Sequence, residues 1–257
     1  MYLAHGATHP GRVRKINEDA FLIEPELGLF AVADGMGGHN AGEVASKLAL
    51  EAVRSFVARS AGGADFTWPY GINPSLSFRG NRLMTAVKLA NRRVFKAGET
   101  HDEYAGLGTT IVAVLIDDGQ ASFCGVGDSR IYAVHDGQIE QVTEDDSWIA
   151  AALGRDVAQD PAAIAHNPMR HVLTSAVGAR PDVDVEVSER ALRPGETLLL
   201  STDGLHGVLD RDAILRCLAA NQAPDTTADQ LVHLALDTEA KDNITAVVLR
   251  WMKDGPL

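Results

Sequence analysis

Short apolar runs that end at turn-forming residues are the feature that most constrains how this 257-residue chain can fold. Runs of this length bounded by Gly, Asp or Pro are typical of β-strands. The predicted strands cover residues 20–24, 29–33, 109–116, 121–126, 130–134, 139–142, 183–187, 197–201 and 244–251. Two connections are the dipeptides Asp118-Gly119 and Asp136-Gly137, and Asp-Gly favours tight hairpins because it tolerates positive φ. The middle of the chain therefore predicts an antiparallel meander.

Longer segments show apolar residues at helical spacing, as Val44, Leu48 and Phe56 do. The predicted helices cover residues 41–59, 81–96, 211–221 and 227–238. Antiparallel strands combined with long amphipathic helices favour one layered α+β domain over residues 1–257. Residues 60–80 are rich in Gly, Pro and Ser but also hold several aromatic residues. We therefore expect a turn-rich insertion that its aromatic side chains hold against the body.

The charge balance excludes several partners. Lys and Arg number 23 against 35 Asp and Glu, a net charge of −12. Such acidity argues against nucleic acid and against an anionic membrane surface, since both require clustered Lys and Arg. Two cysteines, Cys124 and Cys217, are too few for a disulfide framework and are expected to be reduced thiols. With no apolar signal region and no apolar run of membrane-spanning length, we expect a cytoplasmic protein.

Four aspartates stand at the ends of apolar runs: Asp34, Asp128 and Asp203 each close one, and Asp242 directly precedes another. Carboxylates that meet at one end of a sheet repel one another unless a cation neutralises them. Mg²⁺ and Mn²⁺ prefer such oxygen ligands, and a pair of ions can activate a shared water. Gly35 would let its backbone carbonyl approach an ion. An isolated Asp-Gly pair is also a common turn, so spacing alone leaves both interpretations open.

Seven motifs stand in a fixed order at residues 11–19, 33–38, 108–110, 125–130, 173–178, 201–204 and 242–245. Together they resemble the metal-dependent Ser/Thr protein phosphatases (protein phosphatase 2C, or PPM), in particular the compact bacterial form. The resemblance implies a four-layer αββα fold, in which a central antiparallel β-sandwich is flanked by helices on both faces. It also implies hydrolysis of phosphoserine and phosphothreonine on proteins by a metal-bound hydroxide, without a phosphoenzyme intermediate. The substrates would be phosphoproteins of a Ser/Thr kinase.

The resemblance assigns metal ligands to this sequence. Asp34 would bridge two Mn²⁺ or Mg²⁺ ions, and the carbonyl of Gly35 would bind one of them. Asp203 and Asp242 would hold the other ion. Asp128 would help to bind a third, weaker ion.

The resemblance also assigns residues around the ions. Glu18 and Asp19 would orient metal-bound water, and Arg14 would bind the substrate phosphate, a task suited to a guanidinium. Animal and plant relatives have a His after Asp-Gly that resembles a leaving-group acid, whereas this chain has Met36, as bacterial relatives do. His39 is then the candidate general acid, and a metal-bound water is the alternative.

Two further segments bear on the site. Residues 143–147 read Thr-Glu-Asp-Asp-Ser where relatives usually read Thr-x-Asp-His-Ser, so that Asp146 replaces a His. Residues 154–171 lie where relatives carry a mobile flap beside the active site, and they are a candidate for substrate selection.

Two alternative functions are open to the sequence. Cys124 and Arg130 have the Cys-x₅-Arg spacing of cysteine-dependent phosphatases, in which a low-pKa thiolate attacks phosphorus. Asp128 would place a negative charge inside that phosphate cradle, so the fit is poor. The other alternative is an inactive phosphatase-like binding module, which would have no need of Arg14 together with all the metal-binding aspartates.

Overall fold

The computed structural model describes residues 2–38, 41–62, 67–153, 167–169, 171–220 and 222–252. Two antiparallel sheets form its centre. The first contains, in spatial order, β1 (Tyr2–His9), β11 (Ile244–Trp251), β10 (Thr197–Ser201), β7 (Arg130–His135) and β8 (Gln138–Gln141). The second contains β2 (Asp19–Glu24), β3 (Leu29–Met36), β5 (Ile111–Asp117), β6 (Gln120–Val126) and β9 (Glu186–Ala191), with β4 (Gly108–Thr109) paired to β3.

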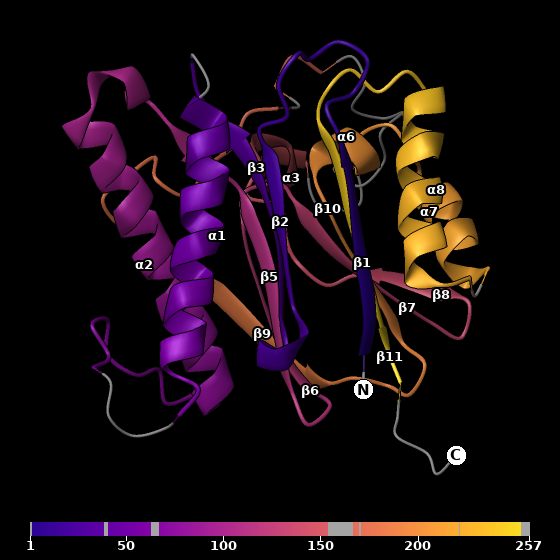
Figure 1. The fold of residues 1–257 in the computed structure, drawn as a ribbon, viewed down its shortest axis with the longest axis horizontal. Coiled ribbons are helices and arrows are strands. Elements are labelled where there is room, and N and C mark those ends of the chain that lie inside the picture. The colour runs from indigo at the N-terminus through magenta and orange to yellow at the C-terminus, as the bar shows by residue number, and fades with distance from the viewer. Residues whose placement is uncertain are drawn as a thin grey trace.

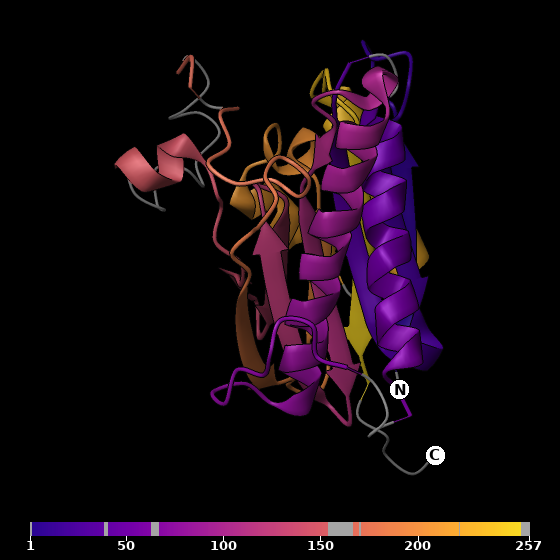
Figure 2. The ribbon, with the colours of Figure 1, turned by 90° about the vertical axis from the view of Figure 1, so that its left-hand side faces the viewer.

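Helices cover the outer face of each sheet (Figure 1). The described helices are α1 (Ala41–Arg59), α2 (Phe78–Thr100), α3 (Trp148–Leu153), α6 (Asp203–His206), α7 (Arg211–Ala219) and α8 (Pro224–Asp237), with short 3₁₀ turns η1 (Pro25–Leu27) and η2 (Asp102–Tyr104). Of these, α1 and α2 cover the second sheet, and α7 and α8 cover the first. Helices α1 and α2 lie side by side over the second sheet, and α3 stands out from the body (Figure 2). This arrangement confirms the predicted four-layer αββα fold.

Three apolar layers hold the sandwich together. Phe30 and Phe123 of the second sheet meet Ile131 and Leu200 of the first between the sheets, all at most 1% exposed. A second layer lies under α1 and α2, and a third lies between the first sheet and α7 and α8. Burial of apolar surface on both faces of each sheet makes the strand framework rigid, so that loops at its ends are positioned precisely enough to form a site.

Most predicted elements form, with two exceptions. Strand β1 was not predicted, because its sequence is polar and rich in small residues, yet it pairs with β11 over its whole length. Strand β9 begins at Glu186 and extends to Ala191, so the prediction of 183–187 was wrong. Val183 and Val185 pack into the layer under α1 and α2, but the ladder with β6 starts only where Glu186 pairs with Gly125.

The predicted Asp-Gly turns form, and the described part of residues 60–80 contacts helix α2 through its aromatic side chains. Asp118 and Asp136 have φ of 45° and 51°, as tight hairpins require. The Trp68 ring packs edge-on against Phe78 at 5.7 Å, and the Tyr70 hydroxyl donates to the Lys88 carbonyl. Helix α2 begins at Phe78, earlier than predicted, because the Ser77 side chain caps it by accepting from the Gly80 N–H. Phe66 lies outside the described residues.

None of the helices described is both long enough and apolar enough to cross a membrane.

Candidate active site

The strand register brings the predicted acidic residues to one end of the sandwich. Ser201, at the end of β10, pairs with Ala246 and with Arg130, so that this end lies beside the starts of β11 and β7. In the second sheet Asp19 pairs directly with Asp34. The aspartates that these strands carry to the shared end are Asp19, Asp34, Asp128, Asp203 and Asp242.

Asp34 lies within β3, two residues before its end, whereas the sequence placed it after the strand. The pairing of β3 with β5 stops at Val32, and a separate pairing with β4 begins at Gly35. Asp34 occupies this interruption, where its N–H donates to Thr110 Oγ1 at 3.1 Å. Its carbonyl accepts from the Thr110 N–H at 2.9 Å and from Thr109 Oγ1 at 2.7 Å. The backbone is therefore fixed, and its side chain lines the cavity at this end of the sandwich.

Asp19 links the two sheets. Its Oδ2 accepts from Thr202 Oγ1 at 2.9 Å and from Thr245 Oγ1 at 2.7 Å, both on the first sheet's side of the sandwich. Its Oδ1 is buried without a hydrogen-bond partner. Burial raises the pKa of Asp19 to about 7, with the charges of Asp203 and Asp242 adding to the rise and the two threonines opposing it.

The carboxylates are electrostatically coupled. Burial raises the pKa of Asp34 well above its ordinary value, and the charges of Asp19, Asp203 and Asp128 raise it further. Burial and the charge of Asp203 likewise raise the pKa of Asp128 to about 8. Clustered acids of this kind are stabilised in their charged form by a cation, and oxygen donors suit Mn²⁺ or Mg²⁺.

The donor set therefore fits a divalent cation in two respects: the shared negative charge and the unpartnered Oδ1 of Asp19. Within the described ranges, no three His, Cys, Asp or Glu side chains lie close enough together to hold a metal ion as they stand. The fit thus rests on the chemistry of the converging oxygens.

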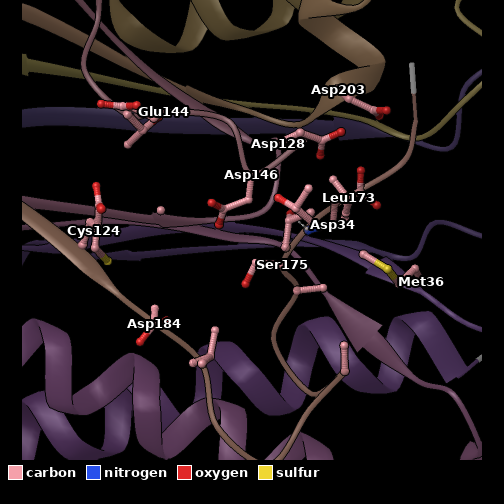
Figure 3. Close-up of a pocket in the computed structure, with 18 of the residues that line it drawn as sticks. Asp34, Met36, Cys124, Asp128, Glu144, Asp146, Leu173, Ser175, Asp184 and Asp203 are labelled. Atoms are coloured by element: carbon pink, nitrogen blue, oxygen red, sulfur yellow. Dashed lines mark hydrogen bonds between the residues drawn. The ribbon is translucent and has the colours of Figure 1, made fainter. Parts of the chain in front are cut away.

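A cavity of about 1070 Å³ opens at this end of the sandwich. Figure 3 shows Asp34, Asp128, Asp146 and Asp203 lining it, together with Met36 and Leu173. Arg14, Glu18, Gly35, His171 and Asp242 also line it, and one wall is formed by the segment between residues 173 and 188. Where the strands end, the cavity is lined by the acidic side chains of Asp34, Asp128, Asp203 and Asp242.

Gly35 is required by packing as well as by any role of its carbonyl. A Cβ at this position would lie 2.0 Å from the Gly42 carbonyl oxygen and 2.6 Å from that of Glu18. The backbone of Gly42, in the first turn of α1, and that of Glu18, just before β2, therefore leave no room for a side chain at position 35. The sequence indicated the glycine but attributed it to the approach of an ion.

Arg14 and Glu18 lie on the loop between β1 and β2, which Asn243 holds in place. The Asn243 side chain accepts from the Glu18 N–H at 2.8 Å and donates to the carbonyls of Pro10 and Ile16. Burial raises the pKa of Glu18. Arg14 pairs with Asp242. The sequence gave Asn243 no role, although it lies in one of the quoted motifs.

Asp146 and His171 border the site. The Asp146 carboxylate accepts from the Gly127 N–H at 3.1 Å, and its own N–H donates to the Gly127 carbonyl at 2.7 Å, so that it fixes the turn before Asp128. His171 Nδ1 lies 3.5 Å from Asp203 Oδ2, a contact the sequence did not indicate. The proposed acid His39 lies outside the described residues, as do residues 154–166 and 170 of the proposed flap.

Cys124 and Arg130 do not form a phosphate cradle. Burial raises the pKa of the Cys124 thiol to about 12, so the nucleophilic thiolate is not available near neutral pH. Arg130 binds the Asp145 carboxylate with Nε and Nη2 and donates from Nη1 to the Tyr132 hydroxyl. The Arg130 guanidinium is therefore held in a buried ion pair with Asp145 and is not available to bind phosphate.

The fold of this chain matches solved bacterial serine/threonine phosphatases. The catalytic domain of PstP, solved in complex with two manganese ions, matches with a TM-score of 0.80 and 28% identity, over 98% of this chain and 100% of that one. The sequence profile of protein phosphatase 2C matches residues 6–244, and the chain belongs to this family.

Two relatives show how far the similarity extends. A putative protein phosphatase 2C-type protein of Streptococcus pyogenes is 30% identical over 94% of each chain. The serine/threonine protein phosphatase PstP of Mycobacterium tuberculosis is 31% identical over 93% of this chain, which spans only 43% of that protein's length.

Proposed function

We propose that this protein hydrolyses phosphoserine and phosphothreonine on proteins with the help of two Mn²⁺ or Mg²⁺ ions. The observation that carries the proposal is the convergence of coupled, buried carboxylates from both sheets on one cavity. The relatives support it, since PstP is named as a serine/threonine protein phosphatase and its catalytic domain was solved with two manganese ions. We further propose that residues 1–257 form one catalytic domain.

In this proposal Asp34 and the Gly35 carbonyl, from the second sheet, would hold the ions together with Asp203 and Asp242, which follow β10 and precede β11 of the first sheet. Asp128 would help to hold a third ion. When bound, the ions would supply Lewis acidity that activates water and offsets charge on the phosphoryl group, so that no covalent phosphoenzyme is needed.

The remaining roles fall to this chain's own residues. The Arg14 guanidinium is half exposed at the cavity and can bind two phosphate oxygens at once. Glu18 lines the cavity, and Asp19 offers its unpartnered Oδ1, so both can accept hydrogen bonds from a water and orient it. Met36 cannot donate a proton to the leaving oxygen, and we assign that step to His39 or to water.

The proposed substrates are phosphoproteins made by a Ser/Thr kinase. The cavity is large enough for a phosphorylated side chain, and the proposed cations together with Arg14 would offset the repulsion between its phosphate and the acidic lining. Both cysteines are free and buried, which supports the expected cytoplasmic setting.

The test is hydrolysis of a phosphothreonine peptide and of p-nitrophenyl phosphate with Mn²⁺, with Mg²⁺ and with EDTA. We expect turnover that requires a divalent ion and returns when Mn²⁺ replaces EDTA. A folded protein that binds Mn²⁺ but releases no phosphate from any substrate would instead favour a binding module. Hydrolysis that persists in EDTA would exclude the metal-dependent mechanism.

A further inference from the structure

A closed ring of hydrogen bonds holds Asp19, and three of its members have no role in the proposed mechanism: Asn17, Thr8 and Thr245. Thr8 Oγ1 lies 2.8 Å from Thr245 Oγ1, and Thr245 Oγ1 donates to Asp19 Oδ2 at 2.7 Å. Asn17 closes the ring, since its Nδ2 donates to Thr8 Oγ1 at 2.8 Å and its Oδ1 accepts from the Asp19 N–H at 3.2 Å. The ring therefore holds Asp19 by its backbone and by its carboxylate.

The ring joins the two sheets. Thr8 of β1 stands directly opposite Thr245 of β11 in the first sheet, whereas Asp19 begins β2 of the second. Asn17 lies on the loop between β1 and β2. Thr245 is fully buried and Asp19 is 7% exposed. Water therefore cannot replace the bond between them, and its loss would leave a buried acceptor with one donor fewer.

The hydrogen bonds of the ring all run in one direction. A threonine hydroxyl has a single proton, and Thr245 gives its own to Asp19, so at the contact with Thr8 it accepts. Thr8 has then used its proton and accepts from the Asn17 amide nitrogen. With Nδ2 facing Thr8, Asn17 presents Oδ1 to the Asp19 N–H. Each atom thus meets a partner of the opposite kind, and bonds in such a series strengthen one another.

The ring fixes a property that strand pairing leaves open. The register of β2 and β3 places Asp19 opposite Asp34, but it does not set the rotation of the carboxylate about the side-chain bonds. The hydroxyls of Thr245 and Thr202 set it, because both donate to Oδ2. Oδ1 is left buried and without a hydrogen-bond partner.

We propose that Asn17, Thr8 and Thr245 are positioning residues, which orient the Asp19 carboxylate through this ring so that Oδ1 is left to accept from water at the cation site. The inference rests on the proposed function, which gives Asp19 the task of orienting that water. Outer groups that orient a metal site change metal affinity or activity by about 10- to 100-fold when they are lost. A ring that only held the sheets together would affect stability alone.

The test compares two substitutions of the buried threonine. Thr245→Val replaces the hydroxyl by a methyl group at nearly constant volume and breaks the bond to Asp19. Thr245→Ser keeps the hydroxyl and loses only the methyl group. Thr227→Val is the matched control, because Thr227 of α8 is also fully buried and its hydroxyl donates to the Ala223 carbonyl, outside the ring.

The readouts are Mn²⁺ affinity by calorimetry, kcat and KM for a phosphothreonine peptide, and Tm in EDTA. We expect Thr245→Val to weaken Mn²⁺ binding and to lower kcat, each about 10-fold. KM should not change, because Arg14 makes the proposed phosphate contact. Thr245→Ser should restore most of both effects, and Thr227→Val should lower Tm alone. A folded Thr245→Val protein with wild-type Mn²⁺ affinity and kcat, or a Ser variant as impaired as the Val variant, would overturn the proposal.

A double-mutant cycle with Asp19→Asn shows whether Thr245 acts through Asp19. Residues that act as one unit are not additive. In a protein that already carries Asp19→Asn, we therefore expect Thr245→Val to weaken Mn²⁺ binding further by about 2-fold or less. A further loss as large as the one in the wild-type background would show that Thr245 does not act through Asp19.

Asn17→Ala keeps the proposal testable if Thr245→Val does not fold. It removes both ring contacts of a partly exposed loop residue, and we expect Mn²⁺ affinity and kcat to fall in the same direction. Wild-type values of both would count against the ring. A wild-type protein that binds no Mn²⁺ and hydrolyses nothing contradicts the proposed function, whereas an active wild type with unaffected ring variants contradicts only the role of the ring.

Discussion

Arg14 Nη2 lies 2.8 Å from Asp242 Oδ2, so the proposed phosphate-binding cation is paired with a proposed metal ligand. This hydrogen bond is the main cause of the raised pKa of Arg14. Both side chains are about half exposed, and ion pairs of that exposure contribute little to stability, about 1 kcal/mol or less. Arg14 can therefore leave Asp242 at small cost when a phosphate or a metal ion competes for either partner.

The first prediction concerns Arg14. Arg14→Ala should raise KM for a phosphopeptide about 10-fold or more, because a charge-assisted contact to the phosphate is lost. Mn²⁺ affinity should stay the same or increase, since Asp242 loses a competing cation. Arg14→Lys is the matched control. Its KM should lie between those of the wild type and Arg14→Ala, because lysine keeps the positive charge but lacks the planar guanidinium that can bind two phosphate oxygens. Steady-state kinetics and Mn²⁺ calorimetry measure both effects, and weaker Mn²⁺ binding in Arg14→Ala would contradict this assignment.

The second prediction concerns the ligands on the first sheet's side. Asp203→Asn and Asp242→Asn each remove one negative charge at nearly constant volume. We expect kcat at low Mn²⁺ to fall about 100-fold or more, with the fold intact by circular dichroism. Asp136→Asn is the control, because Asp136 lies in an exposed hairpin turn with φ of 51°, which Asn tolerates. Wild-type rates in either ligand variant would show that its assignment is wrong.

The third prediction is a pH dependence of stability in the presence of a chelator. The folded-state pKa values of Asp19 and Asp128 are raised to about 7 and about 8, from an ordinary value near 4. Between these limits the folded protein binds more protons than the unfolded chain, so the free energy of unfolding falls as pH rises, by up to about 1.4 kcal/mol per pH unit for each group. This loss is complete above the folded-state pKa values.

Thermal melts in EDTA from pH 5 to pH 8.5 measure this effect. We expect Tm to fall across the range, Mn²⁺ to restore it at the alkaline end, and Asp128→Asn to flatten the profile in EDTA. A Tm that stays constant or rises with pH in EDTA would mean that the pKa values of these acids are not raised in the folded protein.

Local patterns in the sequence predicted a layered α+β domain and the aspartates at strand ends, whereas the four-layer sandwich was expected from the family resemblance. Apolar runs, Asp-Gly turns and helical periodicity place most elements, and aspartates at run ends come together once the strands pair. Strand β1 could not be predicted in this way, since its small and polar residues become a strand only through long-range pairing with β11. The start of β9 was wrong because Val183 and Val185 are buried by helix packing and not by a ladder.

The supporting contacts of the site were beyond sequence reasoning for a similar reason. Thr202 and Thr245 donate to Asp19 across the two sheets, and Asn243 fixes the loop that carries Arg14. Each of these bonds joins residues more than 180 positions apart. Their side chains are ordinary polar residues in the sequence, and only the tertiary structure shows which atoms they contact.

The fourth prediction excludes the cysteine mechanism. Cys124→Ala should keep wild-type turnover and Mn²⁺ dependence, because the thiol is 2% exposed, its pKa is raised to about 12 and Arg130 is committed to Asp145. Some loss of stability is expected from the small cavity left in the layer under α1 and α2. Treatment of the folded wild type with iodoacetamide should likewise leave activity unchanged. Loss of activity that follows alkylation, while EDTA has no effect, would favour Cys124 as the nucleophile.

The fifth prediction tests why a glycine follows Asp34. In Gly35→Ala the new methyl group would meet the Gly42 carbonyl oxygen at 2.0 Å, and this atom belongs to the backbone of α1, which cannot rotate away. We expect the free energy of unfolding in EDTA to fall by about 3 kcal/mol or more, as in overpacked cores. Gly38→Ala is the matched control, because a Cβ there meets nothing within 4 Å.

Urea unfolding of both variants in EDTA measures the effect without any contribution from bound metal. Because the clash lies between β3 and α1, the loss should appear in EDTA as fully as it does in Mn²⁺. A Gly35→Ala protein as stable as Gly38→Ala in EDTA, but with weakened Mn²⁺ binding, would show instead that the glycine serves the ion and not the packing of the helix against the strand.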